Sequence, residues 1–281
     1  MTAPLVKPVP ISGSDEIEIA VLSVSKWLRD RCGIDYQSHK LSLLQSRLQQ
    51  VVDRLGLNCI EELQQKLGSG TDSDLANAVM QLASTNHTFF FREPRVLEYL
   101  PASIFPRLAD KQNIRIWSAA SSTGDEAYSV AILAAEHFGL DEARRRVSIL
   151  GTDISERVIR KAELGAYEGP QIEQMPDGIL QRHFRRIGEG TYSVSNEIKS
   201  MCTFRRLNLK STPWPFKSRF DVVLCRNVLY YFNREDQHAV LESIYDVTAP
   251  DGALLTSVTE TIRDLDTRWQ QISAGIYRSA R

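Results

Sequence analysis

The first third of the chain shows apolar residues at the spacing of α-helices. One stripe ends near Gly33 and is made of Ile17, Val21, Val24 and Leu28. A second stripe runs from about Ser38 to Leu55, with apolar residues at steps of three and four: Leu41, Leu44, Leu48, Val51 and Leu55. Shorter helices are predicted at 59–67, closed by Gly68, and at 73–83. The pattern predicts a small all-helical domain over residues 14–84.

From Asn113 onward, short apolar runs alternate with helical stretches. Strands that alternate with helices are typical of a sheet whose strands are mostly parallel. We therefore predict an α/β domain over residues 113–281, joined to the helical domain by a linker and connecting helix at 85–112. The predicted strands are 113–118, 147–152, 202–207, 220–225, 252–258 and about 275–279.

The alternation is interrupted between about 167 and 200. Residues 184–187 and 191–194 flank a Gly188-Glu189-Gly190 turn, which is the pattern of a β-hairpin. We predict a small antiparallel β insertion at the rim of the sheet.

Composition excludes several classes of function. The 281 residues carry a formal net charge of −1, whereas a protein that binds polyanions normally has a basic excess, so we expect no nucleic acid partner. The four cysteines form no CxxC pair, and no histidine spacing suggests a metal site. No apolar run is long enough for a signal peptide or a membrane span. We expect a cytoplasmic protein without membrane insertion.

Three segments together outline one nucleotide-like cofactor pocket. The middle one lies between a predicted strand and a predicted helix, the order that places a ligand above a parallel sheet. It has one glycine, Gly124, and lacks the full GxGxxG pattern, which disfavours a dinucleotide. S-adenosylmethionine (SAM) has no phosphate and needs only small residues there, so the pattern favours a SAM-dependent methyltransferase. The segments are TNHTFFFRE at 85–93, WSAASSTGDEAYS at 117–129 and LCRNVLYYF at 224–232.

Acidic and amide side chains follow the predicted strands. Asp153 closes the second strand, where a carboxylate can accept hydrogen bonds from ribose hydroxyls; the alternative is a cap for the helix beginning near Ser155. Glu126 either neutralises the ammonium or sulfonium charge of SAM or stabilises the dipole of its own helix. Asn208 and Leu209 follow the third strand, where they would meet an adenine, although an asparagine there is more often a turn residue.

The other two segments supply further candidates. The fourth predicted strand delivers Arg226 and Asn227 to the carboxyl edge of the sheet, where a charged residue rarely has no function. The aromatic residues that follow are Tyr230, Tyr231 and Phe232, and we expect at least one of them to do nothing but pack in the core. In the first segment, the residues placed to cover a ligand bound at the joint between the domains are Asn86, Thr88 and Arg92.

Taken together, these segments resemble the chemotaxis receptor methyltransferases, the CheR family, from the helical domain to the last strand. The resemblance implies a class I SAM-methyltransferase fold with a helical N-terminal domain, and methyl transfer from SAM to glutamate side chains of bacterial chemoreceptors, with S-adenosylhomocysteine (SAH) as the other product. It places Arg92 and Tyr231 near the reacting methyl. It implies cofactor contacts at Asn86, Thr88, Arg92, Glu126, Asp153, Asn208, Leu209, Arg226 and Asn227.

The sequence departs from that family at three places. GDEAYS replaces the more usual GEEPYS, which keeps Glu126 but loses a proline at the helix start. Residues 256–260 differ from the small residue and Ser-Glu pair common in relatives, so the resemblance assigns no residue to that edge of the pocket. The hairpin turn at 187–191 is shorter than in relatives that hold a pentapeptide at the receptor's C-terminus, so we predict docking that is independent of the pentapeptide.

The expected partners are the cytoplasmic helical domains of chemoreceptors. Lys40, Arg47 and Arg54 recur every seven residues along one helix edge and are predicted to steer an acidic receptor helix; the alternative is an ordinary solvated edge. We expect the protein to act as a monomer. Two other functions stay open: methylation of a small molecule or of another protein, and a SAM-sensing scaffold without catalysis.

Overall fold

The structure is a computed structural model of the chain and describes residues 13–83, 88–173, 175–176 and 178–280. Its contacts divide the chain into two compact units, Met1–Ala83 and Ser84–Arg281. Within the described residues, no helix combines the length and the apolar character that crossing a membrane requires.

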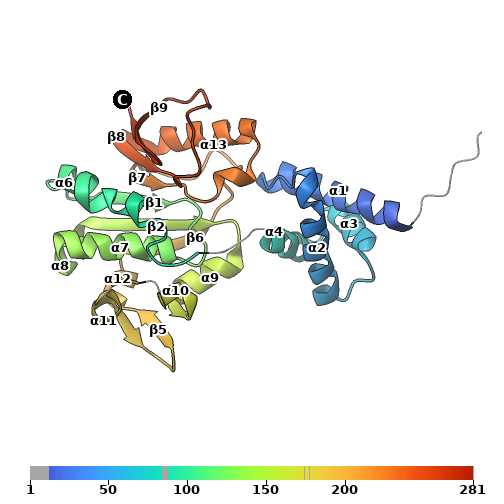
Figure 1. The fold of residues 1–281 in the computed structure, drawn as a ribbon, viewed down its shortest axis with the longest axis horizontal. Helices are drawn as coiled ribbons and strands as arrows, with labels where there is room; N and C mark the ends of the chain where they lie inside the picture. The colour runs from blue at the N-terminus through green and yellow to red at the C-terminus, as the bar shows by residue number, and fades with distance from the viewer. Residues whose placement is uncertain (1–12, 84–87, 174, 177, 281) are drawn as a thin grey trace, which may run out of the picture. The chain divides into compact units, whose positions relative to one another are not determined.

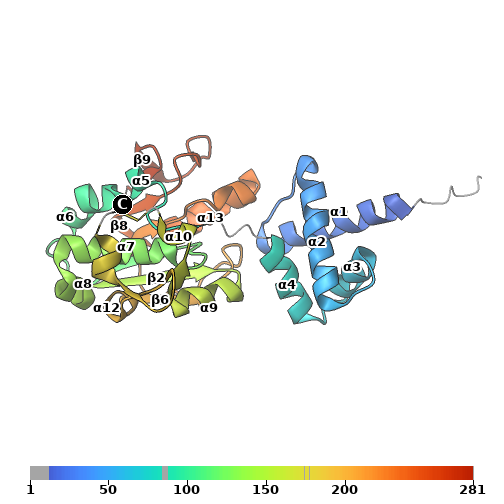
Figure 2. The same ribbon diagram turned by 60° about the horizontal axis from the view of Figure 1, so that its bottom comes forward.

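The first unit is all-helical (Figures 1 and 2). Two of its helices end at a glycine in the left-handed conformation, Gly56 at φ 66° and Gly70 at φ 67°. The third helix therefore ends at Gly70 and not at the predicted Gly68. Leucines that are almost fully buried form the core: Leu28, Leu44, Leu48, Leu63 and Leu75. The elements are α1 (Gly13–Cys32), a 3₁₀ turn (Ser38–Lys40), α2 (Leu41–Leu55), α3 (Ile60–Ser69) and α4 (Ser73–Ala83).

The second unit contains a seven-stranded sheet of order β6-β2-β1-β7-β8-β10-β9. The first five strands in this order run parallel, and β10 and β9 pair antiparallel at one edge, which confirms the mostly parallel sheet. Of these strands, β9 is the one that the apolar pattern did not predict. The strands are β1 (Ile114–Ser118), β2 (Val147–Asp153), β6 (Cys202–Arg206), β7 (Phe220–Leu224), β8 (Thr248–Leu255), β9 (Trp269–Ser273) and β10 (Ile276–Ser279).

Helices cover both faces of this sheet (Figure 1). Because successive side chains of a strand point to opposite faces, Ile116 and Val222 pack in the core formed with α7 (Asp125–Phe138), while Trp117 and Val223 pack in the core formed with α13 (Arg234–Val247). The remaining helices outside the insertion are α5 (Pro94–Leu97), a π turn (Leu100–Ile104), α6 (Phe105–Arg107), α8 (Leu140–Arg146) and α9 (Glu156–Leu164).

The predicted β insertion is a three-stranded antiparallel sheet of order β3-β5-β4. The predicted hairpin is confirmed by β4 and β5, and β3 adds a strand that the sequence did not indicate. Phe90 fixes the insertion to the unit's core, since its ring packs edge-on against Tyr167 at 4.8 Å and Phe184 at 5.2 Å. The elements are β3 (Ala166–Glu168), α10 (Pro170–Glu173), α11 (Ile179–His183), β4 (Phe184–Arg186), β5 (Thr191–Val194) and α12 (Asn196–Lys199).

Candidate functional site

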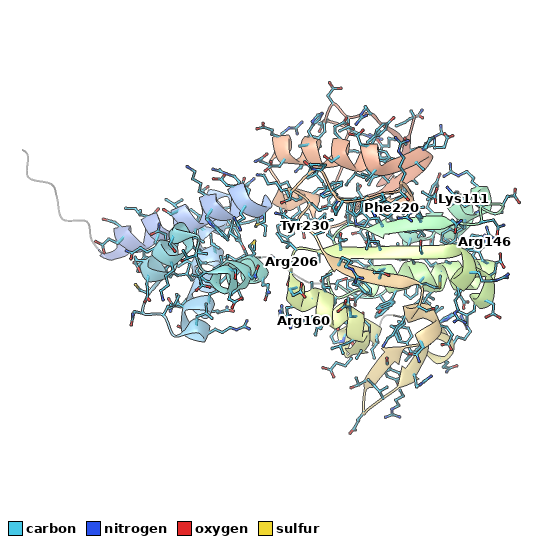
Figure 3. The ribbon with its side chains drawn as sticks, turned by 180° about the vertical axis from the view of Figure 1, so that it is seen from behind. Lys111, Arg146, Arg160, Arg206, Phe220 and Tyr230 are labelled. Carbon is cyan, nitrogen blue, oxygen red and sulfur yellow. The ribbon has the colours of Figure 1, made fainter. Side chains whose placement is uncertain are left out.

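The predicted site residues of the second unit gather at the carboxyl ends of the parallel strands. Figure 3 shows Tyr230 and Arg206 at this end of the sheet and Lys111 and Arg146 at the opposite end. Since the carboxyl ends of parallel strands meet at one edge, segments far apart in the sequence come together there.

The loop between β1 and α7 brings its backbone close to its neighbours. Ser122 and Gly124 have φ angles of 48° and 91°. A Cβ atom at Gly124 would lie 2.8 Å from Cβ of Ala162 and 3.1 Å from the hydroxyl of Tyr167. Glycine is therefore required at 124 by both the backbone conformation and the space.

Asp153, the last residue of β2, lies beside this loop. Its carboxylate accepts hydrogen bonds from the backbone N–H of Ser122 at 3.0 Å and of Ser155 at 2.9 Å. The residue is 9% exposed, and burial raises the pKa of its carboxyl to about 6, against the lowering effect of the N–H donors. The bond to Ser155 closes a local turn before α9, whose N-cap is Ser155 and not Asp153, and the bond to Ser122 ties the carboxylate to the β1 loop.

Buried hydroxyls surround Asp153. The Oγ atoms of Ser121, Ser122 and Ser155 are buried and have no hydrogen-bond partner within the described part of the chain. Buried polar groups are normally satisfied. A carboxylate with free lone pairs beside such hydroxyls fits the two hydroxyls of a ribose.

Arg226 forms a buried ionic network at the end of β7. Its side chain is 1% exposed and lies 2.9 Å from the carboxylate of Glu126 and 3.6 Å from that of Glu93. It also donates to the carbonyl oxygen of Arg92 at 2.5 Å, and Glu126 accepts a further bond from Ser118 at 2.7 Å. Glu126 and Arg226 are thus partners, a pairing that neither reading of Glu126 included.

Asn227 follows in the left-handed region, at φ 57°. Its backbone N–H donates to Glu260 at 2.6 Å, and its side-chain amide donates to Glu93 at 3.0 Å. Glu260 also accepts from the N–H of Leu229 at 2.8 Å and of Ser257 at 3.2 Å. Burial raises the pKa of Glu260, although these N–H donors lower it.

Glu93 and Glu260 were given no role from the sequence. Glu93 stands directly before Pro94, where an acid looks like an ordinary helix-start residue. Glu260 lies in the segment 256–260, where the sequence departs from its relatives. A signal was present in the Ser257-x-x-Glu260 spacing after a strand, but its partners come from the distant loop after β7.

The aromatic pair after β7 lies in a 3₁₀ turn, Leu229–Tyr231. The rings of Tyr230 and Tyr231 are 4.4 Å apart, and the Tyr230 hydroxyl donates to that of Tyr231 at 3.3 Å. Tyr230 is half exposed, and burial, followed by the contact with Tyr231, raises its pKa. Phe232 is 6% exposed in the core, which confirms that at least one aromatic residue of this segment packs there.

The first motif segment supplies Thr88 and Arg92. Thr88 lines a cavity of about 870 Å³ together with Thr123 and Gln171. The guanidinium of Arg92 lies over the ring of Phe89 at 5.9 Å. Asn86 lies outside the described residues.

Asn208 and Leu209 follow β6. Asn208 makes a local turn, because its side-chain oxygen accepts from the N–H of Lys210 at 3.0 Å. Leu209 is 6% exposed and belongs to the core cluster of Trp117 and Trp214. Asn208 and Leu209 therefore have local structural roles. Binding an adenine would be an additional role for each.

The three predicted substrate-binding cations differ in their surroundings. Arg47 is partly buried and donates to the hydroxyl of Tyr36 and to the carbonyl of Ala83, both at 2.8 Å. Lys40 and Arg54 are exposed. Arg47 therefore has a structural role within the helical unit.

The four cysteines differ in burial and in their distance from this cluster. Cys225 follows β7 and is buried, and burial, followed by the charges of Glu260 and Glu126, raises the pKa of its thiol. Burial likewise raises the pKa of Cys202. Cys32 is buried and donates to a backbone carbonyl, while Cys59 is exposed.

Comparison with known families decides what this site belongs to. A family profile described as "CheR methyltransferase, SAM binding domain" matches residues 86–278, and one described as "CheR methyltransferase, all-alpha domain" matches residues 22–82. The chain belongs to the CheR family. Its fold is thus the predicted class I SAM-methyltransferase fold with an all-helical N-terminal domain, and its cofactor is SAM.

Relatives of the CheR family cover most of the chain. The chemotaxis protein methyltransferase of Escherichia coli (strain K12) is 31% identical over 262 residues, which are 90% of this chain and 88% of the relative. Chemotaxis protein methyltransferase 1 of Pseudomonas aeruginosa is 32% identical over 90% of this chain and 95% of its own length. The chemotaxis protein methyltransferase of Borreliella burgdorferi is 31% identical over 82% of this chain and 84% of its own length. The chain is a SAM-dependent chemotaxis methyltransferase of the CheR family.

Proposed function

We propose that the protein transfers a methyl group from SAM to the side-chain carboxylate of specific glutamates in bacterial chemoreceptors, in the cytoplasm, and so forms the methyl esters used in adaptation. The observation that carries the proposal is the match of both units to the CheR family. The cluster at the ends of β1, β2 and β7 supports it, because it offers the donor and acceptor groups that SAM requires.

In this proposal, the residues around the strand ends hold SAM. Asp153 accepts from the ribose hydroxyls, and Ser122 and Ser155 complete that subsite. Asn227 and the ion pair of Glu126 with Arg226 face the amino-acid end, with Asn86 and Thr88 covering it. Asn208 and Leu209 border the adenine. When bound, SAM supplies an electrophilic methyl group on a sulfonium.

In this proposal, the protein mainly aligns the acceptor carboxylate with the methyl group and the sulfur of SAM. An ionised glutamate is already a nucleophile, so no general base is required. The hydroxyl of Tyr231 is proposed to orient the acceptor oxygen, and Arg92 to organise the site; alignment of this kind is worth at most about 7 to 11 kcal/mol. A tight ion pair between Arg92 and the acceptor would stabilise the ground state and slow the transfer.

Receptor docking is assigned to the helical unit. Lys40, in the 3₁₀ turn before α2, and Arg54, on α2, are exposed and are proposed to steer an acidic receptor helix. Arg47, which was predicted with them, also donates to Tyr36 and Ala83 and is the least exposed of the three. The short turn between β4 and β5 supports docking that is independent of a receptor pentapeptide. The protein is proposed to dock as a monomer.

The test is to incubate the protein with methyl-labelled SAM and membranes that contain the receptors of its own source. Base-labile label that maps to glutamates of receptor peptides is the expected result. Label in metabolites but not in receptors would point to a small-molecule methyltransferase. SAM binding without any turnover would point to a non-catalytic scaffold. Tyr231→Phe and Arg92→Ala serve as variants that should lower the rate.

A further inference from the structure

The segment that carries Arg92 has an uncommon backbone conformation. Phe91 and Glu93, which flank Arg92, have φ angles of 57° and 55°. Residues other than glycine are uncommon in this left-handed region, and they persist there only where surrounding contacts hold them. The contacts of this segment therefore show what fixes the backbone of Arg92.

Glu93 makes most of these contacts. Its Oε1 accepts a hydrogen bond from the side-chain amide of Asn227 at 3.0 Å and from the hydroxyl of Ser257 at 2.9 Å. Its Oε2 accepts from the N–H of Val258 at 3.1 Å and lies 3.6 Å from Nη2 of Arg226. One carboxylate thus joins the segment before α5 to the segments that follow β7 and β8.

The charge of Glu93 suits these partners. All four groups around it are donors, and an ionised carboxylate offers acceptors only. Burial by itself would raise the pKa of Glu93, but the hydrogen bond from Asn227 and the charge of Arg226 outweigh burial and lower it. A neutral amide in this place would set its N–H donors either against Arg226 and the N–H of Val258 or, when flipped, against the donors of Asn227 and Ser257.

Two other bonds complete the frame around Arg92. Arg226 donates to the carbonyl of Arg92 at 2.5 Å, and the N–H of Phe91 donates to the hydroxyl of Ser129 at 2.9 Å. Asn227 is held from its other side by Glu260 at 2.6 Å. The same carboxylate of Glu93 therefore restrains both Arg92 and Asn227.

We propose that Glu93 is a positioning residue of the methyltransferase site, which acts through Arg92 and Asn227 and touches neither SAM nor the acceptor. The inference rests on the proposed function, because it takes Arg92 and Asn227 as groups that surround SAM. Glu93 sets where these two groups lie, and its charge is required for that.

The test compares Glu93→Gln with Glu98→Gln in the full chain. Glu98 is an exposed glutamate just after α5, so the control makes the same change of charge five residues further on. For Glu93→Gln we expect the SAH dissociation constant from calorimetry to rise about tenfold and kcat for receptor methylation to fall at least tenfold, with the receptor KM within about twofold of wild type. Glu98→Gln should stay within about twofold of wild type in all three quantities.

Hydrogen exchange separates positioning from folding. In Glu93→Gln, the amides around Val258 should exchange faster, while the unfolding temperature and the calorimetric stoichiometry stay near those of wild type. A purely structural role would lower the folded fraction and leave the SAH affinity of the folded molecules unchanged, which would overturn the proposal. Equal behaviour of the two variants would overturn it as well.

Failure of the proposed function gives a different result. Wild-type protein would then bind SAH but label no receptor. The SAH affinities and the exchange of Val258 would still decide the role of Glu93, because neither measurement requires a methyl acceptor.

Discussion

At the scale of single residues, we expect Asp153, which is proposed to bind the ribose, to make cofactor binding depend on pH. Burial raises its pKa to about 6, so the carboxyl is neutral below this value and ionised above it. Hydroxyl donors of a ribose favour the ionised form. We expect the affinity for SAH, measured by calorimetry between about pH 5 and pH 8, to fall up to about tenfold per pH unit below pH 6.

Two variants check this assignment. Asp153→Asn should bind SAH weakly, and its affinity should not fall further below pH 6, since the amide has no proton to gain. Asp141→Asn, which changes a side chain that is 92% exposed on α8, should keep both the affinity of wild type and its fall below pH 6. If the affinity of Asp153→Asn still fell below pH 6, the titration would belong to another group.

Arg226 should be a large contributor to stability because its removal leaves the partly buried carboxylates of Glu93 and Glu126 without their buried cation. Arg226→Met is expected to lower the free energy of unfolding by about 3–5 kcal/mol, measured by urea unfolding with tryptophan fluorescence. Arg160→Met removes a guanidinium that is 75% exposed and should cost less than about 1 kcal/mol. Equal costs for the two variants would mean that the network around Arg226 is not stabilising.

Sequence reasoning reached those site residues that stand directly after predicted strands. Asp153 and Arg226 have such positions, since a strand and its end can be read from apolar runs. Glu93 and Glu260 could not be assigned because their partners lie 134 and 33 residues away in the chain. The spacing of Arg47 on its helix could not separate a solvated cation from a donor to Tyr36.

At the scale of elements, Gly124 allows the β1 loop to approach α9 and the insertion. Gly124 and Gly70 both have positive φ, at 91° and 67°, but a Cβ at Gly70 meets no atom within 4 Å, whereas one at Gly124 meets Ala162 at 2.8 Å. Gly70→Ala should cost about 1–2 kcal/mol of unfolding free energy.

Gly124→Ala should cost about 1–3 kcal/mol more than Gly70→Ala, because the methyl group also overpacks the contact with Ala162. It should also weaken SAH binding, since the loop that holds Ser122 must move. Urea unfolding and calorimetry of both variants measure the difference. If the two substitutions cost the same, the contact with Ala162 is not what requires glycine at 124.

The sequence predicted the strands whose buried positions form an apolar pattern. It missed the strands in which too few residues are buried to form one. The residues of β7 are all buried, so the strand appears as an apolar run that only Asp221 interrupts. In β9, Trp269 is the one buried residue, and the rest of the strand, three polar residues and the exposed Ile272, shows no alternation of apolar and polar positions. In β3, three residues with one buried tyrosine are too few to show a period.

At the scale of the whole molecule, charge placement matters more than total charge. Lys40→Glu with Arg54→Glu should raise the receptor KM about tenfold and weaken its dependence on salt, while the affinity for SAH stays as in wild type. Lys217→Glu with Arg219→Glu makes the same change of charge at exposed positions before β7 and should leave the receptor KM unchanged. Equal effects of the two double variants would show that total charge, and not the α2 edge, governs docking.

The distribution of the thiols has a consequence for oxidative conditions. Of the four cysteines, all within the described residues, Cys59 alone is exposed, and Cys225, which directly precedes Arg226, is buried with a raised pKa of its thiol. Peroxide and maleimides react with thiolates, so in the native protein they should modify the helical unit at Cys59 and spare the strand ends. Oxidants would then reach the thiol of Cys59 before that of Cys225, and the proposed methyltransferase site would stay chemically unchanged.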